Sequence, residues 1–420
     1  MRLVRARILS VGSELTSGQT TDTNAAWLSR RLGEIGIETI GHAAAPDDEK
    51  RIRDEIRCGA AEVDLLIVSG GLGPTADDLT REALAAVLAV PLVEHGPSLA
   101  AIEEFFRRRG LVMPESNRRQ AFLPGGAEPL ENVRGTAPGI GARLGSAVVF
   151  ALPGVPGEMR EMFERAVLPR LTARSGGRVI RQATLWTFGL PEARVGEILA
   201  DLMQRGRNPS VGTTAHQAVI GVRISATASG PQQADVSLDA TRREIRARLG
   251  GHVFGEGETT LAAAVGNLLR KRGATVAVAE SCTGGLLARR LTDVPGSSDY
   301  FLEGTVAYSN AAKMRLLGVP ADLIRREGSV SRAAAEAMAV RCRERGGADF
   351  ALSITGIAGP TGGTPEKPVG LVYVGLADAA GCTVRELRLG ETLSRDEIRA
   401  RSANAALDML RRALSDEAAT

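Results

Sequence analysis

The strongest constraint on the fold is a regular alternation of strand-type and helix-type segments in the first part of the chain. Short apolar runs such as RARILSVG and VDLLIVSGG alternate with amphipathic runs such as NAAWLSRRLGEIG and LTREALAAVLA. Strands that alternate with helices of this length form a parallel sheet covered by helices. The order βαβαβα therefore predicts an α/β domain at the start of the chain.

Two further blocks follow the first one. A Pro/Gly-rich segment, a strand SAVVFALPG and a helix complete the first block, and the run RSGG at 174–177 indicates a boundary. The strands VIRQATLWTF and AVIGVRISATA, with two helices, then predict a small α+β unit that ends near Gly251. From about residue 258 the βα alternation resumes. We therefore expect an α/β protein with three domains, at residues 1–173, 174–256 and 257–420.

Composition excludes several classes of protein. No apolar run approaches the roughly 18–20 residues of a membrane span, and the N-terminus lacks the long apolar region of a secretory signal. The net charge of +3 is spread along the chain, and aromatic residues make up only 3%. We expect a cytoplasmic protein that binds neither membranes nor nucleic acid. A reducing compartment also fits the cysteines, which are scattered without a CxxC pair, at Cys58, Cys282, Cys342 and Cys382.

Two rare residue types narrow the search for acid–base chemistry. Lysine occurs only at positions 50, 271, 313 and 367, so 48 of the 52 basic residues are arginine. The last histidine is His252, so the C-terminal block has none. Arginine keeps its proton at any working pH, whereas lysine can lose it. Acid–base chemistry in the C-terminal block must therefore use a group other than histidine, and its few lysines become candidates.

The segment TVAVAESCTGGLLARRL has the pattern of a strand, a tight turn and a helix. We expect Ser281, Cys282 and Thr283 at the helix N-terminus, where free backbone N–H groups and the helix dipole favour an anion. Gly284 and Gly285 would allow close backbone approach. Such a turn serves a phosphate, a nucleophile or both. The alternative is a plain helix cap by Ser281 or Thr283, which is the commoner case for such a segment taken alone.

Two more clusters are expected at the same edge of the C-terminal sheet. GTVAYSNAAKMRLLG carries Tyr308 and Lys313, and SITGIAGPTGGTPEKPVG is too rich in glycine and proline for regular structure. The second cluster follows a strand, so it predicts an ordered loop where open α/β sheets bind ligands. Without histidine, a serine nucleophile can use a desolvated lysine as its base. Lys313 is the preferred base. Lys367, its rival, is expected to contact a substrate phosphate.

Cys282 competes with Ser281 for the role of nucleophile, because a helix N-terminus also lowers the pKa of a thiol. No histidine is available to activate it, and continued strand alternation points Cys282 away from the side that Ser281 faces. We therefore interpret Cys282 as a packed thiol.

A second candidate site follows the buried strand in VDLLIVSGGLGPTADDLTREALA. Its Gly/Pro loop predicts a phosphate site built from backbone amides and a hydroxyl, and the two carboxylates after it predict a divalent cation of unknown identity. The alternative is that Asp78 only caps the following helix. Acidic and amide side chains after the first strand are expected at the same edge, where Glu14 and Asp22 are equally good metal ligands. The predicted nucleotide site comprises Glu14, Asp22, Asn24, Gly70, Gly71, Gly73, Thr75, Asp77 and Asp78, the last two as metal ligands.

The motifs VAVAESCTGG, VAYSNAAKMRLLGV, EGSVS and ITGIAGPTGG…KPVG together resemble the C-terminal domain of the CinA (competence/damage-inducible) family, over residues 258–415. That family includes nicotinamide mononucleotide (NMN) amidohydrolases. The resemblance implies conversion of NMN to nicotinate mononucleotide and ammonia without a cofactor, with Ser281 as nucleophile and Lys313 as base. Tyr308 would relay a proton or orient these groups. The substrate loops would comprise Thr283, Gly284, Gly285, Thr355, Gly356, Ala358, Gly359 and Lys367.

The other two blocks extend the resemblance. GSELTSGQTTDTN, GGLGPTADDLT and NVRGTAPG resemble the MoaB/MogA type of molybdopterin-binding fold in its CinA variant, and NPSVGTTAHQAVIGVRISA resembles the KH-like connecting domain of the family. In CinA proteins the first domain is associated with metal-dependent ADP-ribose pyrophosphatase activity, and the family is generally dimeric. The resemblance thus implies NMN and ADP-ribose as substrates and a homodimer, although the same loop design binds molybdopterin in relatives.

Together these features predict an enzyme of pyridine-nucleotide salvage with two independent sites. The rival class is a non-catalytic nucleotide- or pterin-binding scaffold linked to competence and DNA uptake. Ser281 and Lys313 favour the enzyme, because a binding module has no need of a low-pKa lysine beside a serine.

Overall fold

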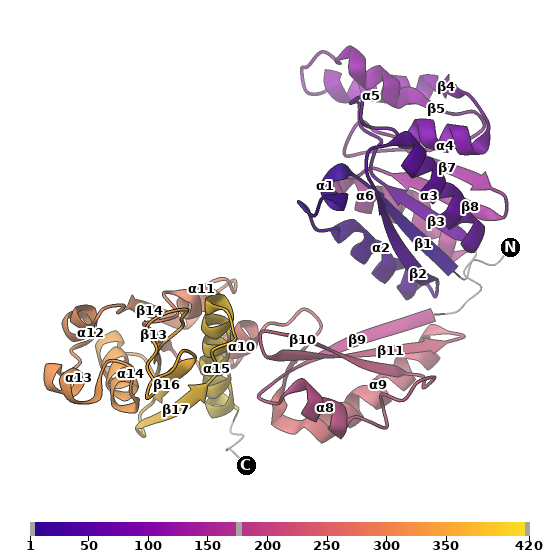
Figure 1. Ribbon diagram of the computed structural model, residues 1–420. Coiled ribbons are helices and arrows are strands. Elements are labelled where there is room, and N and C mark those ends of the chain that lie inside the picture. The colour runs from indigo at the N-terminus through magenta and orange to yellow at the C-terminus, as the bar shows by residue number, and fades with distance from the viewer. Residues whose placement is uncertain (1–4, 174–178, 416–420) are drawn as a thin grey trace. The chain divides into compact units, whose positions relative to one another are not determined.

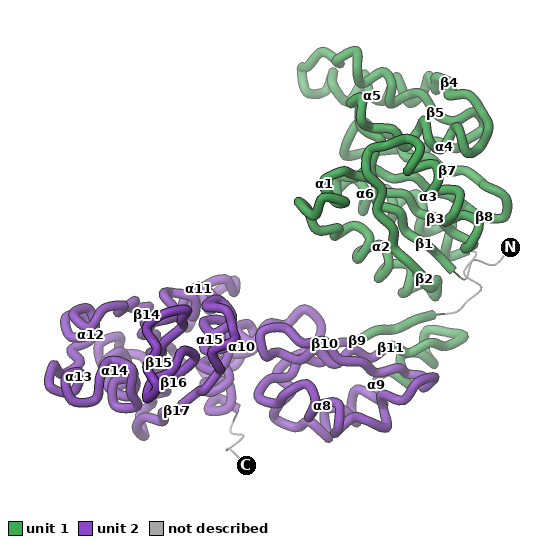
Figure 2. Tube along the Cα trace, in the orientation of Figure 1, with its two compact units in different colours: residues 1–182, 225–238 green, residues 183–224, 239–420 purple. Residues whose placement is uncertain are grey.

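The computed structural model of the protein describes residues 5–173 and 179–415 (Figure 1). The boundary predicted at 174–177 lies outside these ranges. Contacts along the chain define two compact units, of which the first holds residues 1–182 and 225–238 and the second holds residues 183–224 and 239–420 (Figure 2). The predicted middle block is therefore divided between the two units.

The first block contains a six-stranded sheet and a small two-stranded one. Its strands are β1 (Arg5–Val11), β2 (Glu38–Ala45), β3 (Leu65–Ser69), β4 (Leu92–Glu94), β5 (Phe122–Pro124), β6 (Glu128–Leu130), β7 (Gly139–Leu144) and β8 (Ala147–Leu152). The large sheet has the order β2-β1-β3-β8-β7-β6, and β4 pairs with β5. The four neighbouring strands β2, β1, β3 and β8 are parallel, as the βα alternation predicts. At the edge beyond β8, strands β7 and β6 are added by antiparallel pairing.

Helices cover both faces of this sheet, as expected for a parallel arrangement. Side chains of α2 and α6 pack with Ile8 and Ile67 on one face, and those of α3 and α4 pack with Leu9 and Leu66 on the other. The helices are α1 (Ser13–Thr16), α2 (Thr23–Glu34), α3 (Glu49–Glu62), α4 (Thr80–Leu88), α5 (Gly96–Arg107), α6 (Pro156–Met162) and α7 (Leu168–Thr172), with η1 (Glu115–Ala121) and η2 (Phe163–Val167).

The middle block is a four-stranded sheet with helices, which agrees with the predicted α+β unit. Its elements are β9 (Val179–Phe188), α8 (Glu192–Ile198), β10 (Ser210–His216), β11 (Val219–Ala228), α9 (Pro231–Leu249), η3 (Gly250–His252) and β12 (Val253–Glu256). The strand order is β10-β11-β9-β12. Strand β10 was not predicted, because the segment SVGTTAH carries little apolar character, and a two-residue turn joins it to β11.

The C-terminal block is a five-stranded sheet of order β14-β13-β15-β16-β17. Its strands are β13 (Val276–Glu280), β14 (Phe301–Val306), β15 (Phe350–Gly356), β16 (Leu371–Ala377) and β17 (Cys382–Arg388). Its helices are α10 (Leu261–Arg272), α11 (Leu286–Thr292), α12 (Asn310–Leu317), α13 (Ala321–Glu327), α14 (Arg332–Gly346) and α15 (Arg395–Leu414), with η4 (Ser297–Asp299). Strand β14 begins at Phe301, which pairs with Val276 at the start of β13.

The register of the parallel strands places the segments that follow them at one edge. Glu280, the last residue of β13, lies opposite Val306 of β14 and Ile354 of β15. Strands β13, β14 and β15 are parallel, whereas β16 and β17 run antiparallel. The turn after β13, the segment after β14 and the loop after β15 therefore begin side by side, as the sequence predicted.

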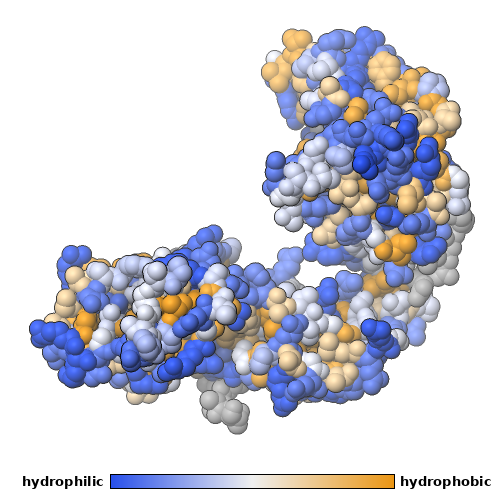
Figure 3. All heavy atoms as spheres, in the orientation of Figure 1, coloured by the Kyte–Doolittle hydropathy of each residue, from blue (hydrophilic) through white to orange (hydrophobic). Residues whose placement is uncertain are grey.

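The exterior gives no sign of a membrane-spanning segment. Within 5–173 and 179–415, none of the helices combines the length and the apolar character needed to cross a bilayer. In the view of Figure 3, hydrophobic residues are dispersed among hydrophilic ones on both units. All four cysteines are unpaired, in agreement with the absence of a disulfide framework in the sequence.

Candidate functional site

Ser281 and Lys313 meet at the edge of the C-terminal sheet. Lys313 Nζ donates a hydrogen bond to Ser281 Oγ over 3.0 Å. Both residues are buried, with exposed fractions of 6% for Ser281 and 2% for Lys313. Ser281 follows β13, and Lys313 lies in α12, whose start is fixed by Ser309, because its Oγ accepts the amide of Ala312 at 3.1 Å. Two residues that lie far apart in the sequence thus form the pair that the sequence predicted.

Burial shifts the pKa values of Lys313 and of Cys282, the residue next to Ser281. The loss of water lowers the pKa of Lys313, because the charged ammonium is penalised more than the neutral amine. Burial also raises the pKa of Cys282 to about 12, so its thiol stays protonated at neutral pH. Cys282 is 6% exposed and packs in the apolar core. The interpretation of Cys282 as a packed thiol is confirmed.

The turn itself differs from the prediction in what occupies its amides. Helix α11 begins only at Leu286, and the buried carboxylate of Glu280 accepts the N–H groups there. Its Oε2 accepts from Gly285 at 3.1 Å and from Leu287 at 3.0 Å, and its Oε1 accepts from Ala288 at 2.7 Å. The helix N-terminus predicted to receive an anion is thus filled by the chain's own carboxylate. The alternative, a cap by Ser281 or Thr283, is wrong as well.

Four further amides lie in this turn, and within the described ranges two of them have no acceptor in another residue. Ser281 N donates to Ile354 O at 2.9 Å, and Gly284 N donates to Ser281 O at 3.0 Å. Within the described ranges, the amides of Cys282 and Thr283 donate to no other residue. Thr283 Oγ1 is also buried without a hydrogen-bond partner in that part of the chain. These donors adjoin the nucleophile, as an oxyanion site requires.

Two arginines of α15 that the sequence analysis missed tie the site together. Arg395 donates to Gly359 O at 2.6 Å and to Tyr308 Oη at 2.8 Å. Arg399 donates to Thr283 O at 2.8 Å. A cation near the N-terminus of a helix is electrostatically unfavourable. Two arginines in the first turns of α15 could therefore have been recognised in the sequence as residues with a role other than helix stabilisation. The start of α15 therefore joins three of the predicted loop residues, Thr283, Tyr308 and Gly359.

Two predicted residues have contacts other than those expected. Tyr308 is 57% exposed, and its hydroxyl bonds to Arg395 and not to the Ser281–Lys313 pair. The ammonium of Lys367 donates to Glu327 O at 2.7 Å and to Val330 O at 2.8 Å. In this structure Lys367 therefore holds the EGSVS segment in place through these two carbonyls. The contact that we predicted for Lys367 was with a phosphate of the substrate, which is a different partner.

The remaining predicted residues of the substrate loops lie on the same side of the sheet. Thr355 Oγ1 donates to Ser329 O at 2.7 Å, which also holds the EGSVS segment. Gly284 and Gly285 adopt φ values of +57° and +91°, in the left-handed region that favours glycine. Gly356 allows close strand approach, because a Cβ there would lie 2.8 Å from Leu371 O. Ala358 is buried in the core beneath the loop.

In the first block, Asp78 closes the Gly/Pro loop on itself. Its Oδ1 accepts the amide of Gly73 at 2.8 Å, and its Oδ2 accepts the amide of Thr75 at 2.9 Å together with the Thr75 hydroxyl. The alternative role as a helix cap is wrong, since the cap position of α4 is Leu79. Asp77 is exposed.

These contacts do not fit the predicted metal site. Both oxygens of Asp78 are already used by the loop, and the described residues contain no group of three His, Cys, Asp or Glu placed to hold a metal ion. Asp22 caps α2, because its Oδ1 accepts the amide of Ala25 at 2.9 Å. Glu14 is exposed and lies against Gly12. In this arrangement the described acidic residues do not gather into a metal site, and the role of Asp77 and Asp78 as metal ligands stays a prediction.

Asn24 does join the two strand ends that were expected to share a site. Its Nδ2 donates to Ser69 Oγ at 3.1 Å and to Gly154 O at 2.8 Å. Its Oδ1 is buried without a partner in the described part of the chain. Gly70 comes so close to β1 that a Cβ would lie 2.2 Å from Val11 O, and Gly71, like Gly70, has a positive φ. The edge formed by β1 and β3 thus presents one unsatisfied acceptor.

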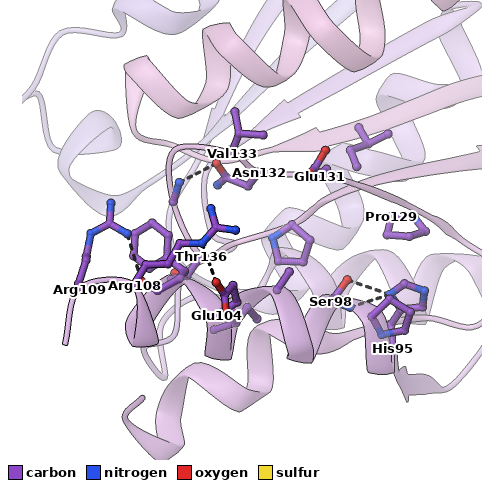
Figure 4. Close-up of a pocket in the computed structure, with 17 residues that line it drawn as sticks. His95, Ser98, Glu104, Arg108, Arg109, Pro129, Glu131, Asn132, Val133 and Thr136 are labelled. Carbon is purple, nitrogen blue, oxygen red and sulfur yellow. Dashed lines mark hydrogen bonds and ion pairs between the residues drawn. The ribbon is translucent and has the colours of Figure 1, made fainter. Parts of the chain in front are cut away.

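The first block also contains a cavity of about 790 Å³. It lies between α5 and the segment 129–138, which contains NVRGTAPG (Figure 4). In Figure 4, Arg108 and Arg109 lie on one side of the cavity, and His95 and Ser98 lie on the other. The side chain of Asn132 accepts two amides of its own segment, from residues 134 and 135, at 3.1 and 2.8 Å. These two backbone donors of the motif are therefore used within it.

Comparison with known proteins covers the whole chain. Family models match at residues 7–173 ("Probable molybdopterin binding domain"), 182–255 ("Damage-inducible protein CinA KH domain") and 258–414 ("CinA C-terminal domain"). A CinA-like protein of Dictyoglomus thermophilum is 43% identical, with 98% of this chain and 99% of that protein covered. A CinA-like protein of Geobacter sulfurreducens is 44% identical, with 97% and 98% covered.

A solved structure is also similar to part of the chain. The competence/damage inducible protein CihA from Agrobacterium tumefaciens shares 43% identity over 37% of this chain and 93% of its own, with a TM-score of 0.36. The full-length relatives and the three family models confirm the resemblance drawn from the motifs. The chain belongs to the CinA family, with a MoaB/MogA-like domain, a KH domain and a CinA C-terminal domain in that order.

Proposed function

We propose that the C-terminal domain is an amidohydrolase that converts NMN to nicotinate mononucleotide and ammonia. The observation that carries the proposal is the 3.0 Å hydrogen bond between Lys313 Nζ and Ser281 Oγ, with both side chains buried. Desolvation keeps a larger fraction of the lysine neutral, and a neutral amine can accept the proton of the serine. NMN as the substrate follows from the family, and Arg395 and Arg399 supply cations suited to its phosphate.

The proposed reaction has an acylation step and a hydrolysis step. Ser281 Oγ attacks the carboxamide carbon as its proton passes to Lys313 Nζ, and the negative oxygen is stabilised by the free amides of Cys282 and Thr283. Lys313 then returns the proton to the leaving nitrogen, and ammonia departs from the acyl-enzyme. In the second step Lys313 takes a proton from water, which attacks the ester and releases the nicotinate carboxylate and the serine.

Three variants separate this mechanism from its alternatives, with ammonia release from NMN as the measurement. Ser281→Ala should abolish release, whereas Cys282→Ala should retain it, because Lys313 is hydrogen-bonded to the serine and the thiol stays protonated. Lys313→Arg should be nearly as inactive as Lys313→Ala, because arginine keeps its charge and cannot accept a proton. Activity in Ser281→Ala, or substantial activity in Lys313→Arg, would assign the chemistry to other groups.

For the first domain we propose a second function, the hydrolysis of ADP-ribose to AMP and ribose 5-phosphate. The observation in its favour is the buried, unpartnered Oδ1 of Asn24 at the edge formed by β1 and β3, which is suited to receive a ligand N–H or O–H group. We assign no metal ligands to this site, because the oxygens of Asp78 already accept hydrogen bonds from the loop.

The test of this second function is the variant Asn24→Ala. It should reduce ADP-ribose hydrolysis by the purified chain and leave release of ammonia from NMN unchanged. Loss of both activities in a folded variant would require one shared site. An unchanged ADP-ribose rate would remove Asn24 from the reaction.

A further inference from the structure

A second cavity in the C-terminal unit has no part in the site described above. It measures about 450 Å³ and lies between the sheet of the middle block and helices α10, α11 and α15, all within the second unit. Its walls include the apolar side chains of Trp186, Val219, Phe254, Leu261 and Leu407. Its volume is in the range of small-molecule sites, and it is lined by aromatic and aliphatic groups as such sites are.

One end of this cavity carries a cation without an anionic partner. Arg290 of α11 donates to Ala400 O at 3.1 Å, to Asn404 Oδ1 at 2.5 Å and to Gln217 Oε1 at 3.2 Å. All three acceptors are neutral, and Arg290 forms no ion pair with any residue that the structure describes. Burial lowers the pKa of its guanidinium, because the charge has lost water without gaining a counter-ion.

The acidic residues nearby are engaged elsewhere. Asp293 also lines the cavity, but it lies 3.6 Å from Arg289, and its side chain is 63% exposed. Glu280 acts on Arg290 electrostatically, yet its oxygens accept the backbone amides at the start of α11. A half-buried cation beside an apolar wall is therefore left for an anion that comes from outside the chain.

We infer that this cavity binds a small carboxylate with an aromatic or aliphatic body, with the carboxylate on Arg290 and the body against Trp186 and Phe254. The ligand must compete with Gln217, whose amide oxygen is one of the three acceptors of Arg290. The bond from Arg290 to Gln217 has one ionised partner, whereas a carboxylate adds a full negative charge opposite the guanidinium, so it replaces this acceptor favourably.

The segment that carries Gln217 is suited to such an exchange. Gln217 and Ala218 form the two-residue turn between β10 and β11, with φ values of +49° and +63°. This conformation is normally taken by Asn-Gly or Gly-rich pairs. The turn is held in place by Arg290 and by Asn404, whose Nδ2 donates to Gln217 O at 3.1 Å. A ligand on Arg290 removes one of these two contacts.

The test uses Trp186 as the reporter of binding. The chain has two tryptophans, so the variant Trp27→Phe leaves Trp186 as the single one. It is titrated with 3-phenylpropanoate and, separately, with the isosteric neutral 3-phenylpropanamide. We expect a saturable change in Trp186 fluorescence with the carboxylate and at least about tenfold weaker binding of the amide, since one charge-assisted bond in place of a neutral one is worth that factor.

A matched variant assigns the binding to Arg290. Gln217→Glu keeps the shape of the side chain but places a carboxylate on Arg290 from within the chain. It should weaken binding of 3-phenylpropanoate about tenfold or more, because the added carboxylate competes with the ligand for Arg290. Equal affinities for the two probes, no saturable response up to about 10 mM, or full affinity in Gln217→Glu would each overturn the inference. Because none of these residues belongs to the Ser281 site, the outcome is independent of the proposed amidohydrolase.

Discussion

The substitution Glu280→Gln tests how the turn that carries Ser281 is held. Glu280 is completely buried, and its two oxygens accept the amides of Gly285, Leu287 and Ala288. Glutamine has nearly the same shape, so the change removes the charge and one acceptor without leaving a cavity. The variant therefore isolates the electrostatic support of the turn.

The magnitude follows from these three bonds. The glutamine oxygen can keep the two bonds of Oε2, but its NH₂ group then faces the amide of Ala288, which loses the 2.7 Å bond. An unsatisfied buried donor costs about 1–3 kcal/mol, and loss of the negative charge at the start of α11 costs about 0.3–2 kcal/mol more. We expect about 1.3–5 kcal/mol in total, which corresponds to roughly 8-fold to 4,000-fold in a local opening equilibrium.

Hydrogen exchange at the amides of Gly285, Leu287 and Ala288 in the full chain measures this opening. The matched control is Glu397→Gln, because Glu397 accepts Ser394 N at 2.9 Å in the exposed capping box of α15. The control should accelerate exchange at its own helix end by about fivefold, since an exposed cap is worth about 1 kcal/mol. If Glu280→Gln changed exchange no more than this control, the buried carboxylate would not be what holds the turn.

Three further predictions concern other buried or constrained groups. Burial lowers the pKa of Lys313 below its ordinary 10.5. At a pH between the lowered pKa of the folded chain and the ordinary pKa of the unfolded chain, the unfolded chain therefore binds more protons. Stability relative to Lys313→Met should therefore rise with pH in that window, by at most about 1.4 kcal/mol per pH unit, and a flat difference in urea unfolding would refute this. Asp78→Asn should accelerate exchange of the amides of Gly73 and Thr75 about tenfold, through loss of about 1.4 kcal/mol, equally with and without a chelator; an effect that disappears with the chelator would restore the metal interpretation. Ala218→Gly should stabilise the chain by about 1 kcal/mol in urea unfolding, because Ala218 has a φ of +63°; no gain would show that the turn is not strained.

The parts of the fold and site that could be predicted are those set by repeated pattern. The alternation of apolar and amphipathic segments was sufficient for the parallel strands β1, β3 and β13, and parallel strands place their carboxyl ends together whatever the loops contain. This is why Ser281 and Lys313 could be paired from the sequence before any distance was known. Strand β10 and helix α13 were missed, because short polar segments become ordered through tertiary contacts and carry no strong periodicity of their own.

Contacts between a side chain and a distant backbone group could not be predicted from the sequence. Arg395 reaches Gly359 and Tyr308, and Lys367 reaches carbonyls of the EGSVS segment, because the loops fold back over the sheet. The length of a lysine or arginine side chain allows many such partners, and a linear pattern does not choose among them. The carbonyl partners of Lys367 could not be predicted for this reason, and its contact with a substrate phosphate stays a prediction.

At both predicted anion sites a neighbouring carboxylate of the chain accepts amides of the turn, and the cause is physical. A Gly-rich turn with free amides attracts an anion, but the pattern does not say which anion arrives. Glu280 precedes the amides that it accepts by only a few residues, and Asp78 follows its own by as few. An acid tethered so closely competes at a high effective concentration, so it takes the amides before a free phosphate does. What is left for chemistry in the C-terminal turn is therefore the pair of amides that Glu280 does not reach, those of Cys282 and Thr283, and these are the ones beside the serine.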